Sequence, residues 1–169
     1  MNRIEKLREF VDEVLLVKKD ADDRRCAYVH LYGVALLCGL IAKKRAANEE
    51  LAVMAGMLHD LYTYKAKNDV GYDDDKTVEI MKNHAEDGAV YAREVLDALD
   101  LTIPEETNAI CTAIHNHSNK DGTFSELDEI LIDADVMQHY FYNPLFPVKA
   151  YEQERLERLL SEFGMSSAV

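Results

Sequence analysis

The residue types most suited to chemistry are histidines and aspartates that recur at helix-length intervals around a His59-Asp60 doublet. The doublet ends an apolar run, and five of the chain's 6 histidines belong to the series. Neutral imidazole and carboxylate bind divalent transition metals, and ligands spread over several buried helices can form one site. The pattern predicts a metal site built from several helices, with its ligands among His30, His59, Asp60, His84, His115, His117, Asp133 and Asp135.

A single histidine on an apolar helix is more often a satisfied core residue than a ligand. Here the histidines occur together, and His30 and the His59-Asp60 doublet lie in apolar surroundings, where an unpaired polar group is costly. Metal coordination would compensate for that lost hydration. The joint occurrence therefore favours metal ligands over core residues.

Two pairs within the series leave alternatives open. Asp133 and Asp135 are two residues apart, so on a helix their side chains point about 200° apart and cannot both face one centre. The same geometry separates His115 from His117. Periodicity alone does not choose between the members of either pair.

The elements that must carry these residues are helices, because apolar residues recur with helical spacing along most of the chain. We expect helices over about residues 2–19, 23–44 and 48–61, with the second apolar nearly all round and therefore in the core. Residues 62–75 lack clear periodicity and predict a loop or broken helix, which we interpret as a lid. A short turn at 77–81 then places His84 near the start of the next helix.

Further helices are expected after Pro104, which suits a first helical turn, and from Ser125 onward, with a last helix ending near Phe163. Good helix formers dominate the composition, with 7 Gly and 3 Pro in 169 residues. The sequence therefore predicts one all-α domain over residues 1–169, built from about six to seven helices. The terminal helices either form a homodimer interface or close the core.

The charge balance bears on partners and location. A net charge of -13 repels a phosphate backbone, which argues against a nucleic acid polymer but not against a small anion bound through a metal ion. Three widely separated cysteines without a CxxC pair fit a reducing cytoplasm. The longest apolar stretch, residues 33–42, is too short to cross a bilayer, so we expect no membrane partner.

The order His30, His59-Asp60, Asp135 resembles the His, His-Asp, Asp signature of the HD-domain metal-dependent phosphohydrolase superfamily, over about residues 25–140. The contexts Met57-Leu58-His59-Asp60-Leu61 and Asp133-Ala134-Asp135-Val136-Met137 are similar to its motifs, and the second favours Asp135 over Asp133. Residues 83–89 and 113–118 look like the additional histidine segments of binuclear members, which favours His117 over His115. The chain lacks the Gly-Tyr-Pro of the cyclic-di-nucleotide-cleaving branch.

The resemblance implies a helical bundle around a metal site that holds divalent ions, two in the binuclear interpretation, chosen from Fe, Mn, Co, Ni and Zn. It implies that a metal-activated water hydrolyses a phosphoester or phosphoanhydride bond in a small phosphorylated substrate. Nucleotides and dinucleotides are the substrates that the resemblance favours. Alternatives are a di-iron oxygenase and a noncatalytic nucleotide-binding module. The implied metal ligands are His30, His59, Asp60, His84, His117 and Asp135, with Asp60 bridging the two ions.

Lys65 follows the doublet closely and is our candidate for contact with a nonbridging phosphate oxygen, as a point charge. Together with the bridging Asp60, it makes up the predicted catalytic pair. The alternative interpretation of Lys65 is an exposed lysine on a loop.

Overall fold

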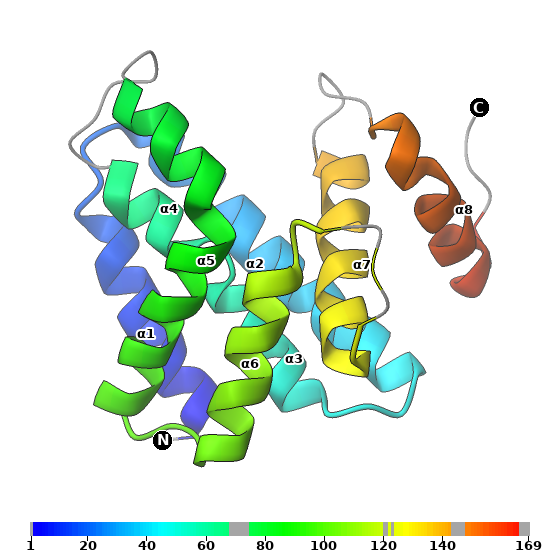
Figure 1. Cartoon of the computed structure of the whole chain (residues 1–169), viewed down its shortest axis with the longest axis horizontal. Coiled ribbons are helices and arrows are strands. Elements are labelled where there is room, and N and C mark those ends of the chain that lie inside the picture. Colours follow the sequence, from blue (N-terminus) through cyan, green and yellow to red (C-terminus); the bar gives the residue numbers. More distant parts are fainter. Residues whose placement is uncertain (1, 68–74, 120–121, 123, 143–147, 166–169) are drawn as a thin grey trace.

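The computed structural model describes residues 2–67, 75–119, 122, 124–142 and 148–165, and in this part of the chain it is helical without strands. This confirms the all-α fold. Figure 1 shows α1 and α8 at opposite ends of the molecule, with α2 running through the middle between them. The elements are α1 (Arg3–Leu16), α2 (Ala21–Lys44), α3 (Glu49–Leu58), α4 (Leu61–Ala66), α5 (Asp75–Ala98), α6 (Pro104–Asn116), α7 (Glu126–Tyr142), the 3-10 helix η2 (Ala150–Glu152) and α8 (Gln153–Glu162).

The first three helices begin where a short polar side chain caps them. The side-chain oxygens of Asn2, Asp20 and Asn48 accept hydrogen bonds from backbone N–H groups three residues later. Such caps satisfy donors that have no partner inside the helix. They fix the starts of α1, α2 and α3 close to where the sequence predicts them.

Helix α2 forms the centre of the core, as its apolar character predicts. It packs against α3 and α7, and its buried side chains join the main hydrophobic cluster. By length and composition alone, α2 would also qualify as a membrane span. Core helices of proteins share these properties, and in this structure α2 is a core helix that carries His30 into the interior.

Two glycines let neighbouring helices come close to the end of α3, where the His59-Asp60 doublet lies. A Cβ atom at Gly56 would lie 2.6 Å from the Cα of Ala35, so glycine allows α2 and α3 to touch through their backbones. A Cβ atom at Gly88 would lie 3.0 Å from the backbone oxygen of His59, which brings α5 against the same point. The two contacts draw three helices together around His59.

The region after the doublet is predicted from the sequence as a loop or a broken helix, and the structure shows a helix in its first part. Residues 61–66 form the short helix α4; the rest of the expected lid, residues 68–74, lies outside the described residues. Helix α4 is held by tertiary packing, with Leu61 and Thr63 buried and the Tyr62 ring 5.8 Å from the Tyr91 ring on α5.

The expected turn at 77–81 is wrong, because α5 is continuous from Asp75 to Ala98. Its buried residues recur on one face over several turns, which favours an unbroken helix. His84 consequently lies in the interior of a long helix instead of near its start.

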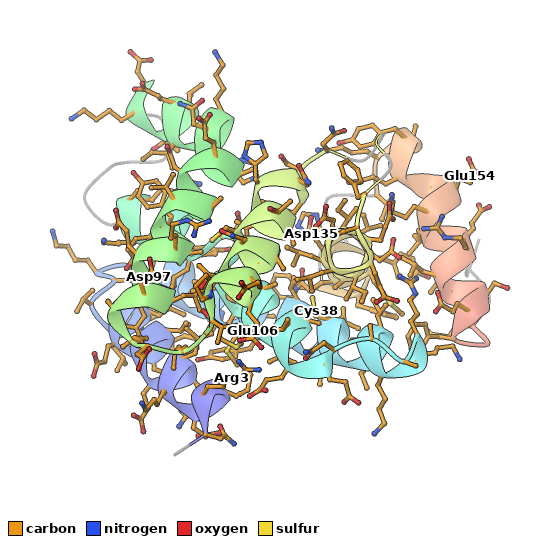
Figure 2. The ribbon with its side chains drawn as sticks, turned by 60° about the horizontal axis from the view of Figure 1, so that its bottom comes forward. Arg3, Cys38, Asp97, Glu106, Asp135 and Glu154 are labelled. Carbon is orange, nitrogen blue, oxygen red and sulfur yellow. The ribbon has the colours of Figure 1, made fainter. Side chains whose placement is uncertain are left out.

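The two ends of the chain are tied to the bundle by different contacts. Arg3 on α1 binds Glu106 on α6 and Glu50 on α3, each at 2.7 Å (Figure 2 shows Arg3 beside Glu106). Helix α8 packs on α7 through a small second cluster of Val136, Met137, Leu156 and Leu160. The predicted metal ligands are carried by the elements from α2 to α7.

Candidate metal centre

The six predicted metal ligands come from five segments, since His59 and Asp60 are adjacent, and they converge in the interior of the bundle. In Figure 2, Asp135 lies between α6 and α7, whereas Asp97 and Glu154 lie at the outside of the molecule. The contributing positions are His30 on α2, His59 just after α3, Asp60 just before α4, His84 on α5, His117 just after α6, and Asp135 on α7.

The histidines are oriented by hydrogen bonds from their Nδ1 atoms. His59 donates to the backbone oxygen of Gly56 at 2.8 Å, and His84 donates to that of Met81 at 2.8 Å. His117 makes the equivalent bond to Ile114, again three residues earlier. A proton fixed on Nδ1 leaves Nε2 as the atom that can bind a metal, which is the usual role of such supporting bonds. The local helix backbone therefore sets the ligand atom of these three histidines.

His30 is oriented by a side chain instead. Its Nδ1 donates to Oε1 of Gln138 at 3.0 Å, and the amide of Gln138 in turn donates to the Val29 backbone oxygen at 3.4 Å. Gln138 is buried, with 3% of its surface exposed. The amide thus belongs to the support of the site, a role that the sequence analysis did not assign.

A first group of donors surrounds His30. Its Nε2 lies 3.0 Å from Nε2 of His59, 3.5 Å from Oδ2 of Asp60 and 3.8 Å from Oδ1 of Asp135. The Nε2 atom of His59 is 3.8 Å from the same Asp60 oxygen. His30, His59 and Asp60 offer ligand atoms that all lie within 4.8 Å of one another.

A second group lies on the other side of Asp60. Oδ1 of Asp60 is 3.7 Å from Nε2 of His117, and the rings of His84 and His117 are 5.0 Å apart. Asp60, His84 and His117 also offer ligand atoms within 4.8 Å of one another. The two oxygens of one carboxylate therefore face two separate groups of histidines.

Burial and charge shift the proton affinities at the centre in opposite directions. Burial acts to lower the pKa of His30, but hydrogen bonding to Asp60 and the charges of Asp135 and Asp60 outweigh it and raise the pKa to about 9. Burial lowers the pKa of His59 to about 4 and also lowers the pKa of His117. Burial opposes ionisation of Asp60, yet the neighbouring histidines hold the pKa of that carboxyl well below its usual range.

The donor set fits a divalent metal ion. Imidazole nitrogens and carboxylate oxygens suit Mn, Fe, Co, Ni and Zn, and the Nε2 atoms of His30 and His59 aim at each other. Within the described residues, Oδ1 of Asp60 is buried without a hydrogen-bond partner. A buried carboxylate oxygen without a partner is costly, and a metal ion on that side would compensate for the loss.

The alternatives that periodicity left open are separated in space. Asp133 is fully buried on the opposite side of α7, where Arg45, Arg155 and Arg158 bind it at 2.7, 2.6 and 3.3 Å. The Asp133 carboxylate is thus paired with three arginines, while the Asp135 carboxylate faces His30. His115 is exposed at the end of α6, whereas His117 is buried beside Asp60.

Lys65 does not point toward these residues. It lies on the exposed side of α4, with its Nζ atom 4.1 Å from the centre of the Tyr91 ring on α5. This is the geometry of a cation–π contact. The structure therefore separates Lys65 from Asp60, the other member of the predicted catalytic pair.

His139, the sixth histidine, is not among the metal ligands predicted from the sequence. It lies one turn after Asp135 on α7, with Nε2 3.7 Å from Oδ1 of that aspartate, and it is half exposed at the rim. His30, Asp135 and His139 form a third group whose ligand atoms lie within 4.8 Å of one another. The signal available in the sequence was the four-residue spacing between Asp135 and His139 on one helix face.

Comparison with known protein families agrees with this geometry. The family model described as HD domain matches residues 27–139, which contain every residue of the two donor groups around Asp60. No curated protein and no solved structure matches the chain. HD domains bind divalent metals, and most of them are metal-dependent phosphohydrolases. The match covers more than half of the chain, and the protein belongs to the HD domain family.

Proposed function

We propose that this protein is a metal-dependent phosphohydrolase that cleaves a phosphoester or phosphoanhydride bond in a small phosphorylated metabolite. The observation that carries the proposal is the position of Asp60. Its Oδ2 lies near His30 and His59, and its Oδ1 lies near His117. A carboxylate placed in this way suits a bridge between two metal ions, which is common in phosphoryl-transfer sites.

The predicted ligands would divide into two sets, one for each metal ion. His30, His59 and Asp135 would hold one ion together with Asp60, and His84 and His117 would hold the second with the other oxygen of Asp60. Divalent ions held there would lower the pKa of a bound water and neutralise charge on the phosphoryl group. The Nδ1 hydrogen bonds to Gly56, Met81, Ile114 and Gln138 would keep the histidines oriented during turnover.

Nucleotides and dinucleotides are the substrates that we propose, on the strength of family membership. The net charge of -13 supports a small substrate over a polymer, because surface repulsion grows with the number of phosphates that must approach. A small ligand would instead meet its counter-charge at the metal ions.

The test is phosphate release from nucleotides and dinucleoside polyphosphates. The protein is stripped of metal, reloaded with Mn, Fe, Co, Ni or Zn separately, and assayed without oxygen. We expect release to require metal and to be lost in Asp60→Asn, which keeps the size of the side chain but weakens its binding of metal. His115→Ala is the matched control and keeps its activity, because His115 is exposed and outside both donor groups.

Three results would contradict the proposal. Equal release by the metal-free protein would exclude a metal-dependent reaction. Oxygen consumption by the iron-loaded protein, without phosphate release from any compound, would indicate a di-iron oxygenase. Tight nucleotide binding without turnover under any metal would indicate a noncatalytic module.

A further inference from the structure

The face of α4 that begins at Asp60 carries a second lysine. At about 100° per residue, positions 60, 63 and 67 lie on one side of the helix, whereas position 65 lies on the other. This register separates Lys67 from Lys65, although only one residue lies between them. Lys67 is the residue that caps the C-terminal end of α4, and it is half-buried.

The ammonium group of Lys67 lies beside the helix segment that holds His84. Its Nζ donates to the sulfur of Met81 at 2.7 Å, and the backbone oxygen of the same Met81 accepts the hydrogen bond from His84 Nδ1. Burial lowers the pKa of Lys67, and the carboxylate of Asp60 partly opposes that effect. Lys67 therefore contacts the same residue, Met81, whose backbone oxygen orients His84, a predicted ligand of the second ion.

This ammonium group has unused hydrogen-bonding capacity. Lysine has three donors, and a thioether sulfur is only a weak acceptor. Within the described residues, no carboxylate forms an ion pair with Lys67. The nearby Lys18 differs, because its Nζ donates to the Tyr64 backbone oxygen at 2.9 Å and lies 3.5 Å from Asp23.

The hydroxyl group of Thr63 is a second group without a partner on the same face. Thr63 is 4% exposed, and among the described residues its Oγ1 finds no hydrogen-bond partner. A buried hydroxyl without a partner destabilises the fold, so a ligand that accepts its proton would be favoured. Thr63 lies one turn before Lys67 and one turn after Asp60.

We propose that Lys67 and Thr63 bind phosphoryl oxygens of the substrate beside the metal centre, in place of the predicted Lys65. The inference rests on the proposed function, because it takes the ligand to be a phosphorylated compound. Lys67 supplies the positive charge, and Thr63 supplies a neutral donor. In a chain with a net charge of -13, such a local cation is needed to hold phosphate oxygens that the metal ions do not reach.

The experiment measures binding of inorganic phosphate to the full-length, manganese-loaded protein by isothermal titration calorimetry. We expect Lys67→Ala to weaken phosphate binding about tenfold or more, as the loss of a charge-assisted hydrogen bond implies. Lys67→Arg keeps the charge and should recover part of the affinity, and Thr63→Val should cause a smaller loss. Lys65→Ala is the matched control and should stay within about twofold of the wild type.

Metal content is measured on every variant, and we expect it to be unchanged, since neither lysine belongs to a donor group. Equal phosphate affinity in Lys67→Ala and the wild type would overturn the inference. So would an equal loss in Lys65→Ala, or absence of phosphate binding by the wild type.

The result also separates this inference from the proposed function. Phosphate binding that depends on Lys67, without hydrolysis of any phosphorylated compound, would support the anion site and refute the phosphohydrolase. Hydrolysis with the same KM and kcat in Lys67→Ala and the wild type would support the phosphohydrolase and refute the anion site.

Discussion

Binding of a metal ion at His30 should release a proton. The structure predicts how many protons are released per ion and over which pH range. The pKa of His30 is about 9, so without a bound cation this histidine is charged at pH 7. Its Nε2–H then donates to the Nε2 lone pair of His59 at 3.0 Å, while its Nδ1–H donates to Gln138. A metal ion needs the Nε2 lone pair of His30, so binding must displace that proton.

The free-energy cost of removing the His30 proton depends on how far the pH lies below the pKa of His30. At pH 7, about two units below that pKa, competition with the proton weakens metal binding roughly a hundredfold, or by about 3 kcal/mol. Affinity should therefore rise about tenfold from pH 7 to pH 8 and level off as the pH passes 9. His59, with a pKa of about 4, is already neutral at pH 7 and adds no proton.

The assay is calorimetric titration of manganese into the metal-free protein at pH 7, in two buffers with different ionisation enthalpies. The difference in heat gives the number of protons released, and we expect about one per ion at the His30 position. His30→Gln measures the background from other groups, and His115→Ala should match the wild type. Affinity equal at pH 7 and pH 8, with no proton released, would refute the reasoning.

Three other substitutions test the support of the site. Asp133→Asn removes the charge of a fully buried carboxylate that binds three arginines, two of which keep a second carboxylate partner. It should lower the free energy of unfolding by about 1–3 kcal/mol in urea denaturation, and an unchanged free energy would contradict this. Gly56→Ala forces a Cβ against the Ala35 backbone and should cost about 1–3 kcal/mol, seen as a lower Tm; an unchanged Tm would contradict the close helix contact. Gln138→Leu removes the acceptor for His30 Nδ1–H and should weaken metal binding about 10- to 100-fold in the same titration, whereas an unchanged affinity would remove Gln138 from the site.

Much of the architecture could be predicted because apolar periodicity and capping residues act locally. The central position of α2 followed from its apolar surface on all sides. Helix α4 could not be predicted in this way, since its stability comes from contacts with distant residues, such as Tyr62 with Tyr91 and Lys18 with the Tyr64 backbone.

In the candidate site, too, the sequence predicts one part, and the fold determines the other. The types and spacing of His30, His59 and Asp60 pointed to a metal centre, but spacing could not assign roles to the two lysines of α4. Closeness to the doublet in sequence favours Lys65, but the structure places Lys65 against the Tyr91 ring and Lys67 against the Met81 sulfur, beside the segment that holds His84.

The most direct test of the account is the number of metal ions bound per chain, measured by elemental analysis on protein purified without a chelator or an affinity metal. The account predicts two ions in the wild type, one in His117→Ala, and two in His115→Ala, because only His117 lies beside Asp60 Oδ1. One ion in all three proteins would contradict a second ion between Asp60, His84 and His117, and with it the bridging role of Asp60.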